Sequence, residues 1–228
     1  MKKKQIYPSM VLIAGLLLAG YGPAGADNEE YSGFLKDYSG LEKYKDPAGN
    51  QMLREISPKF TPANYHALII EPIQLFPEPE PNEKVSQSTL DDLVTYINTE
   101  LKARMATKVE VTDKPGSGVA RLRIAVTGVG AKTQDLKPYQ YIPVALVLTA
   151  VKRATTGAPE DAKLYIEGEA TDSVSGERLM ITVRKGTGEA LKASTEGEKV
   201  VTLDTLKPLV DKWIDGTITE TDKFIKSK

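Results

Sequence analysis

The residues that could carry out chemistry are few, and three of them lie close together in the sequence. Two carboxylates stand two positions apart, at Glu167 and Glu169, and Asp172 follows. Two carboxylates in different environments are the arrangement that glycoside hydrolases use for acid–base and nucleophilic work. The neighbouring residues alternate as in a β-strand, which places Glu167 and Glu169 on one face. We expect this face to be solvated, so a hydrolase built on Glu167, Glu169 or Asp172 is the third hypothesis.

Other catalytic chemistries lack the residues they need. The chain has no cysteine and one histidine, which excludes disulfides, thiol catalysis, cysteine-ligated zinc and iron–sulfur clusters. A histidine-based metal site is disfavoured for the same reason. The Ser-Gly pairs that begin at Ser32 and Ser39 lack the Gly-x-Ser-x-Gly elbow of a serine nucleophile and are typical of turns. We therefore expect a non-enzymatic protein with no catalytic residue, metal or cofactor.

Charge and length narrow the class of protein. The 228 residues include 30 Lys and Arg against 31 Asp and Glu, a formal net charge of −1. Nucleic-acid binding needs a clustered basic field, so this balance argues against a nucleic acid as partner. Removal of an N-terminal signal would leave about 200 residues, enough for one domain with a hydrophobic core.

Residues 1–26 have the pattern of a bacterial export signal. A basic start at residues 2–4 precedes an apolar run over residues 11–19, and the segment ends in Ala24-Gly25-Ala26. We expect cleavage after Ala26, with Asp27 as the first mature residue. The alternative is a retained, uncleaved membrane anchor, although the apolar run is shorter than the ~20 residues of an ordinary spanning helix.

Within this signal, residues 18–22 resemble a lipoprotein processing site with Tyr21 in the place of the acylated cysteine. A tyrosine cannot form the thioether, so the chain as written cannot be acylated at this position. Either an ancestral lipid anchor has been lost, or this copy carries a substitution that makes the product soluble.

Patterning predicts the elements of the mature chain. We assign residues 27–60 to a tether whose aromatic residues dock on the domain, with a disordered spacer as the alternative, and residues 61–228 to a single domain. Residues 65–76 predict one buried strand, stopped by the alternating prolines of residues 77–81. A helix follows, capped by Ser88 with Asp91.

The second half of the chain predicts more sheet and a closing helix. In residues 121–127, Leu122, Ile124 and Val126 point inward and the arginines outward, as a solvated face. Residues 164–187 predict a β-hairpin, and residues 204–225 an amphipathic helix capped by Asp204. The expected fold is α+β: a mixed, mostly antiparallel sheet with two amphipathic helices packed on one face.

Four segments together resemble a family of bacterial envelope lipoproteins catalogued as domain of unknown function 3313. These are residues 31–41, 67–76, 111–123 and 167–177. The resemblance covers essentially the whole mature chain. It implies an envelope protein similar in layout to the small α+β lipoprotein domains that accompany envelope transporters and secretion pores. Members of the family usually carry the cysteine that Tyr21 replaces, and the family has no established catalytic residues to carry over.

The leading hypothesis is a non-enzymatic exported envelope protein that acts as an accessory or scaffold subunit of a transport or secretion assembly. We expect it in the periplasm, with outer-membrane association left open, and with other envelope proteins or a second copy as partner. The expected interaction surface comprises Tyr31, Phe34, Tyr38, Tyr139, Tyr141, Ile142, Leu146 and Leu148. The alternative is a small-molecule or lipid-binding module, in which the apolar segment 139–151 covers a pocket between sheet and helices.

Overall fold

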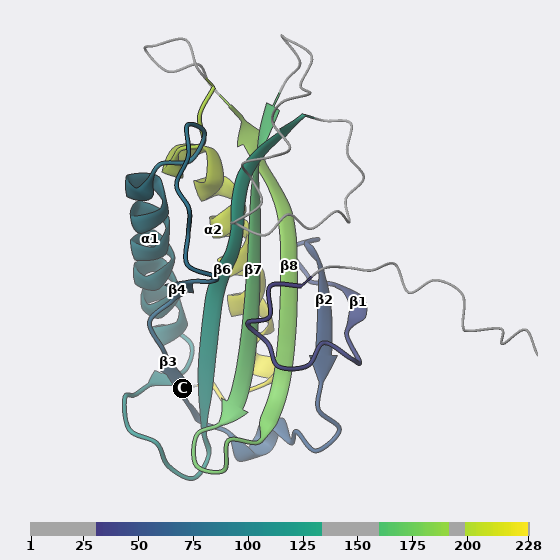
Figure 1. Cartoon of the computed structure of the whole chain (residues 1–228). Coiled ribbons are helices and arrows are strands. Elements are labelled where there is room, and N and C mark those ends of the chain that lie inside the picture. The colour runs from purple at the N-terminus through teal and green to yellow at the C-terminus, as the bar shows by residue number, and fades with distance from the viewer. Residues whose placement is uncertain (1–30, 134–159, 192–198, 228) are drawn as a thin grey trace, which may run out of the picture.

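One mixed sheet organises the protein. The computed structural model describes residues 31–133, 160–191 and 199–227 (Figure 1). In this part of the chain, the strands follow the order β1-β2-β8-β7-β6-β3-β5, with β4 beside β6. The pairs that join β1, β2, β8, β7 and β6 are antiparallel, whereas β3 and β4 run parallel to their neighbours.

The strands and helices have these bounds. The strands are β1 Glu42–Lys45, β2 Gln51–Ile56, β3 Ala67–Ile70, β4 Gln74–Leu75, β5 Glu110–Val111, β6 Val119–Thr133, β7 Glu160–Asp172 and β8 Arg178–Ala190. The helices are α1 Gln87–Ala106 and α2 Leu203–Glu220, with short 3-10 turns at Pro62–Asn64 and Thr221–Lys223.

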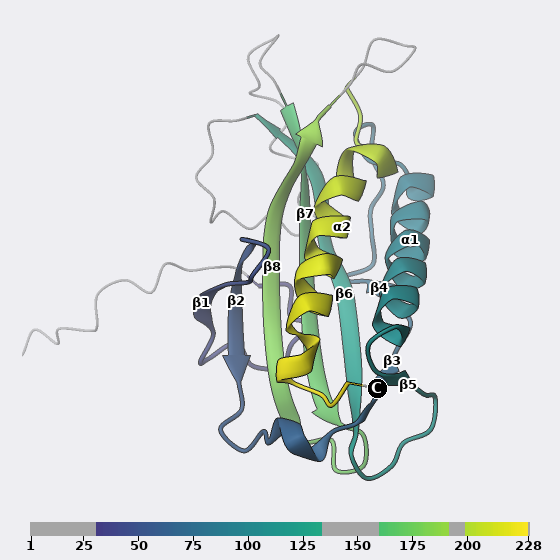
Figure 2. The ribbon, with the colours of Figure 1, turned by 180° about the vertical axis from the view of Figure 1, so that it is seen from behind.

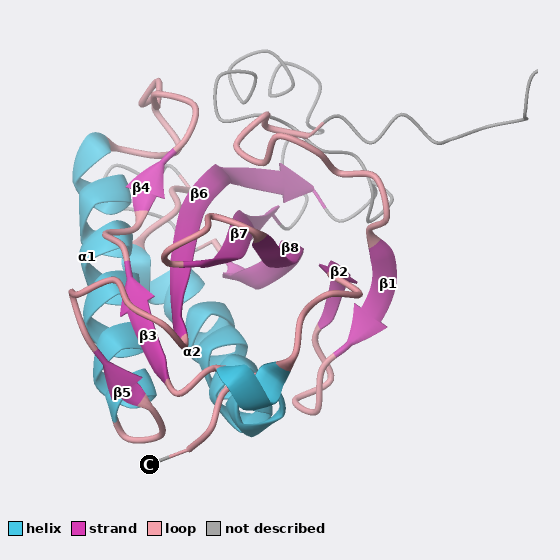
Figure 3. Ribbon diagram, turned by 90° about the horizontal axis from the view of Figure 1, so that it is seen from below, coloured by secondary structure: helices cyan, strands magenta, loops and turns pink. Residues whose placement is uncertain are grey.

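Both helices cover the same face of the sheet, so the predicted α+β class is confirmed (Figures 1 and 2). The apolar side chains of α1 recur at helical spacing, which turns one stripe of the helix toward the strands. The buried residues of the two stripes are Leu90, Leu93, Ile97, Leu101 and Met105 in α1, and Leu206, Val210, Trp213 and Ile214 in α2. In the view along the strands, the helices lie on one side of β6, β7 and β8 (Figure 3).

The helix caps differ from the predicted ones. Helix α1 begins at Gln87, so Ser86 and not Ser88 is its N-cap. The Ser86 hydroxyl accepts a hydrogen bond from the Thr89 backbone N–H at 3.1 Å. Helix α2 is capped by Thr202 rather than Asp204, and the Thr205 hydroxyl accepts from the Thr202 N–H at 3.1 Å. In both cases a hydroxyl three residues from the orphan backbone donor makes the cap.

The predicted single strand over residues 65–76 is wrong. It is two short strands, β3 and β4, separated by three irregular residues that include Pro72. Proline has no N–H to donate to a ladder, so it interrupts the pairing with β6. All four residues of β3 are buried, which accounts for the continuous apolar run.

Part of the predicted tether, residues 27–60, belongs to the sheet. Residues 42–56 of that range form β1 and β2, and β2 pairs with β8 from Met52 to Ile56. The turn between them contains Gly49 at φ +82°, and Asp46 accepts a hydrogen bond from the Asn50 N–H at 2.8 Å. Strand β1 is an edge strand with mostly exposed polar side chains. It therefore lacks the alternation of apolar and polar residues from which a strand is predicted.

Candidate functional site

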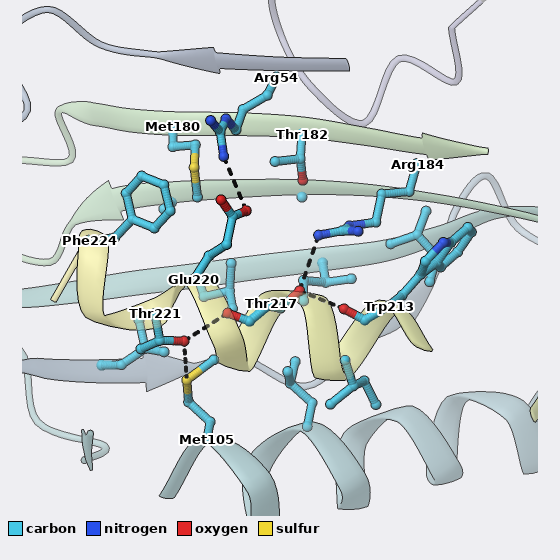
Figure 4. Close-up of a pocket in the computed structure, with 18 of the residues that line it drawn as sticks. Arg54, Met105, Met180, Thr182, Arg184, Trp213, Thr217, Glu220, Thr221 and Phe224 are labelled. Atoms are coloured by element: carbon cyan, nitrogen blue, oxygen red, sulfur yellow. Dashed lines mark hydrogen bonds and ion pairs between the residues drawn. The ribbon is translucent and has the colours of Figure 1, made fainter. Parts of the chain in front are cut away.

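A cavity of about 170 Å³ lies between the sheet and the helices (Figure 4). Its floor is formed by β2, β6, β7 and β8, and its roof by α1 and α2. The residues that follow α2, including Phe224 and Ile225, close one end. Almost all of the surface that lines it is apolar.

Small side chains on the inward face of the sheet leave this space open. Ala120, Gly168, Ala170 and Thr182 occupy inward positions on three adjacent central strands, beneath α2. Protein interiors are close-packed, with few voids larger than a water molecule, so a cavity of this size is a distinct feature. Its neighbours Leu122, Ile124 and Ile166 belong to central strands yet are only half-buried.

The polar groups of the cavity lie along its β2–β8 side. Arg54 of β2 donates to Glu220 of α2, with Nη1 and Oε2 3.3 Å apart (Figure 4). The Arg54 guanidinium also lies over the Tyr44 ring, 3.3 Å from its centroid, and the Tyr44 hydroxyl donates to Glu220. Lys223 Nζ, 3.2 Å from Glu220 Oε1, is the third donor to this carboxylate.

Arg184 of β8 is the second arginine of the cavity. Its Nη1 donates to Asp46 Oδ2 at 3.3 Å and its Nη2 to Thr217 Oγ1 at 3.2 Å. Burial lowers the pKa of the Arg184 guanidinium, and the hydrogen bond to Asp46 opposes that change. Burial would raise the pKa of Asp46, but hydrogen bonds from Asn50 and Arg184 outweigh it and hold that pKa below its usual value. The pair therefore stays ionised.

Glu167 lies on the opposite face of the sheet from the cavity. The expectation that its face is solvated is wrong, because Glu167 is wholly buried. Its carboxylate accepts hydrogen bonds from the Tyr38 hydroxyl at 2.6 Å and from the Ser32 N–H at 3.2 Å. The segment over residues 31–41, here called the N-terminal strap, covers it.

The other two predicted carboxylates also serve the fold. Glu169 accepts from Arg123 at 3.0 Å and from Arg178 at 3.4 Å. Asp172 accepts from backbone N–H groups of the hairpin turn, and the hydrogen bond from Ser175 lowers its pKa. The three carboxylates therefore hold the strap, an ion-pair cluster and a turn, and they do not meet in a cleft.

Three residues of the predicted interaction surface contact the protein's own sheet. Phe34 of the strap is buried in a cluster with Ala125, Ile181 and Val183, and its ring lies 5.7 Å from that of Phe76. The rings of Tyr31 and Tyr38 stack with centroids 4.1 Å apart. The strap crosses the sheet face that the helices leave free (Figure 1).

The remaining predicted residues lie outside the described part of the chain. They are Tyr21, Ala24, Ala26 and Asp27 of the signal, and Tyr139, Tyr141, Ile142, Leu146 and Leu148 of the apolar segment. Across the described ranges, no group of three His, Asp or Glu residues could hold a metal ion, and neither helix could span a membrane.

Arg54, Arg184 and Glu220 were not among the residues predicted from the sequence. A signal for the site exists in β8, where Ile181 and Val183 alternate with Thr182 and Arg184. The apolar pair faces the strap, so the polar pair faces the helices. A strand whose helix-covered face carries polar residues departs from the usual rule for core-facing positions.

Comparisons with known proteins place the chain in a family. It is 30% identical over 219 residues to the uncharacterized lipoprotein YdcL of Escherichia coli strain K12. This alignment covers 95% of this chain and 97% of the relative. A neuraminyllactose-binding hemagglutinin homologue from Helicobacter pylori is 12% identical, with a TM-score of 0.36 over 80% of this chain and 93% of the other. The minor lipoprotein of Acinetobacter baumannii is 14% identical, with a TM-score of 0.26 over 70% and 91%. At these scores the structural likeness is partial. The model of the family described as Protein of unknown function (DUF3313) matches residues 30–217, and the chain belongs to this family.

Proposed function

We propose that this protein is an exported protein of the bacterial envelope that binds a small, largely apolar ligand in the cavity between sheet and helices. The cavity carries the proposal. The lipoprotein name of the YdcL relative and the export-signal pattern of residues 1–26 support the location, which we assign to the periplasm. Association with the outer membrane would depend on the anchor that Tyr21 puts in question.

The cavity is the right size for one small apolar group. An engineered cavity of about 150 Å³ with an apolar lining stays dry and binds benzene. This cavity is partly open to solvent and its wall is almost wholly apolar. An apolar group that filled it would remove that surface from water, which contributes roughly 25 cal/mol per Å².

Native mass spectrometry of protein purified from the envelope tests the proposal. We expect a non-covalent adduct on the wild-type protein. Ala170→Phe places a ring in the cavity and should remove the adduct. Ala103→Phe makes the same change at an exposed position of α1 and should keep it.

Circular dichroism checks that both variants fold. An adduct that persists in a folded Ala170→Phe variant would exclude the cavity as its site. Wild-type protein that carries no adduct and binds no added apolar compound would overturn the proposal.

The accessory or scaffold role stays a prediction. Among the described residues, only Ile56 and Val174 are large apolar side chains that are exposed, so partner contacts would fall to the segment 139–151. Deletion of that segment should remove partners captured by cross-linking in the envelope. Recovery of the same partners without the segment would contradict this role for it.

A further inference from the structure

We infer that the ligand is a single-chain amphiphile with an anionic headgroup, and that Arg184 and Arg54 bind this headgroup while the chain lies over β6 and β7. The inference rests on the proposed function, because it assigns a chemical class to the ligand of the same cavity. It follows from the distribution of charge along the cavity wall, from the surroundings of Arg184 and from the volume.

The cavity has a polar side and an apolar side. Register places Arg54 opposite Thr182 and Met52 opposite Arg184, so both arginines lie along the β2–β8 pair. The lining residues from β6 and β7 are all apolar or glycine: Ala120, Leu122, Ile124, Ile166, Gly168 and Ala170. An amphiphile would match both sides, with its polar end at β2–β8 and its chain toward β6 and β7.

Arg184 is a buried cation with unused hydrogen-bonding capacity. Its side chain is 11% exposed. A guanidinium has five N–H donors, and the described part of the chain supplies acceptors to two of its nitrogens, at 3.2 and 3.3 Å. Those distances are at the long end for a charge-assisted bond. A carboxylate or phosphate oxygen in the cavity would supply the acceptors that the protein leaves out.

The charged residues of the cavity wall also favour an anion. Two arginines, Arg54 and Arg184, line the cavity, and only one of their two carboxylate partners, Glu220, lines it with them. Next to an apolar cavity the effective dielectric constant is lower than in water, so charge–charge attraction is stronger. A cationic headgroup would meet like charge there.

The volume limits the ligand to one chain. Pockets that hold drug-sized ligands are about 300–1,000 Å³, and this cavity is about 170 Å³. A short or partly inserted single acyl chain fits that space, and a second parallel chain does not.

Three eight-carbon probes with different headgroups test the inference: octanoate, octan-1-ol and octylammonium. Calorimetric titration uses full-length processed protein that has been freed of bound lipid. We expect octanoate to bind about tenfold or more tighter than octan-1-ol, and octylammonium to bind weakest.

The Arg184→Met variant keeps a chain of similar length and removes the charge. It should lose about tenfold in octanoate affinity and leave octan-1-ol binding within about twofold. Because this change leaves Asp46 buried and unpaired, the double variant Arg184→Met with Asp46→Asn is measured as well, with the fold of each checked by Trp213 fluorescence. Arg121→Met is the matched control, since Arg121 pairs with Glu71 on the other face of the sheet.

The outcomes separate the two proposals. Equal binding of octanoate and octan-1-ol, or a preference for octanoate that survives in the folded Arg184 variants, would overturn the headgroup inference and leave the ligand-binding function standing. If none of the three probes bound, the ligand-binding function would fail and the inference with it.

Discussion

The N-terminal strap should be held to the sheet chiefly by one hydroxyl, that of Tyr38. It donates to the buried Glu167 at 2.6 Å and accepts from the Gly33 and Leu35 N–H groups at 3.0 Å each. The change Tyr38→Phe removes all three hydrogen bonds while keeping the ring that stacks on Tyr31. It therefore isolates the polar contribution of the strap from its apolar packing.

The expected loss of stability follows from the partners of the Tyr38 hydroxyl, which lose a hydrogen bond in the variant. A hydrogen bond to a charged group contributes roughly 1.5–3 kcal/mol, and an unsatisfied buried donor costs roughly 1–3 kcal/mol. Of the two hydrogen bonds that Glu167 accepts from the strap, only the one from the Ser32 N–H remains. Leu35 is 2% exposed, so its N–H is poorly placed to reach water. The Gly33 N–H is exposed and can be hydrated at little cost. We expect Tyr38→Phe to lower the free energy of unfolding by about 3 kcal/mol.

Urea denaturation measures this change, with fluorescence of the single tryptophan, Trp213, as the probe of the core. Hydrogen exchange at Leu35 reports whether the strap opens before the rest. Tyr96→Phe is the comparison, because its hydroxyl also donates to a carboxylate, Asp211, at 2.7 Å. Asp211 is partly exposed and keeps its ion pair with Arg104, so we expect a loss of about 1 kcal/mol there.

A loss below about 1 kcal/mol for Tyr38→Phe, with unchanged exchange at Leu35, would refute this account of the strap. It would mean that Phe34 and Leu35 hold the segment by apolar burial alone. Equal losses for the two tyrosine variants would refute the part of the reasoning that depends on the burial of Glu167.

Three further predictions follow from the described contacts. Burial, and then a hydrogen bond to a carboxylate, raise the pKa of Tyr65 and of Tyr96 to about 12. The stability that these two hydroxyls contribute should therefore be complete below pH ~10 and be lost as the pH rises through about 12. Tyrosinate absorbance and the free energy of unfolding, both measured as functions of pH, check this. Gly118 has φ +75°, and an added Cβ would lie 2.6 Å from a histidine ring, so Gly118→Ala should lower the free energy of unfolding by at least about 2 kcal/mol. Gly176 has φ +72° but open space around it, so Gly176→Ala should lower it by only about 1 kcal/mol. Thermal denaturation of both variants measures the difference. Arg104 of α1 forms ion pairs with carboxylates on both helices and is partly exposed. Arg104→Met should therefore lower the free energy of unfolding by about 1 kcal/mol, and by less at 1 M salt. A loss that salt leaves unchanged would contradict this.

Local patterning was enough to predict the fold class. The stripe from Leu90 to Met105 predicts a sheet-packing helix, and the alternation of Leu122, Ile124 and Val126 predicts a strand with one covered face. In both cases one side of a helix or strand is buried, and the apolar residues recur in the sequence with the period of that element. Patterning failed at strand β1, whose side chains are polar and mostly exposed, and at Pro72, which interrupts a continuous apolar run.

The surroundings of the charged residues could not be predicted in the same way. Glu167 was expected on a solvated face because strand alternation gives the side of the sheet but not what covers that side. The strap, more than 120 residues away in the chain, decides that Glu167 is buried and bound to Tyr38. The same limit applies to Arg184, whose inward position follows from alternation but whose neighbours Asp46 and Thr217 come from distant elements.

The sequence by itself determined the two helices, the central strands, the apolar faces of these elements and the absence of thiol chemistry. The cavity was decided only by the tertiary structure. It exists because small residues on β6, β7 and β8, unremarkable in each strand, come into register beneath α2. Whether side chains fill the space between two layers depends on which residues stand opposite one another, and that is a property of the assembled sheet and helices rather than of any one segment.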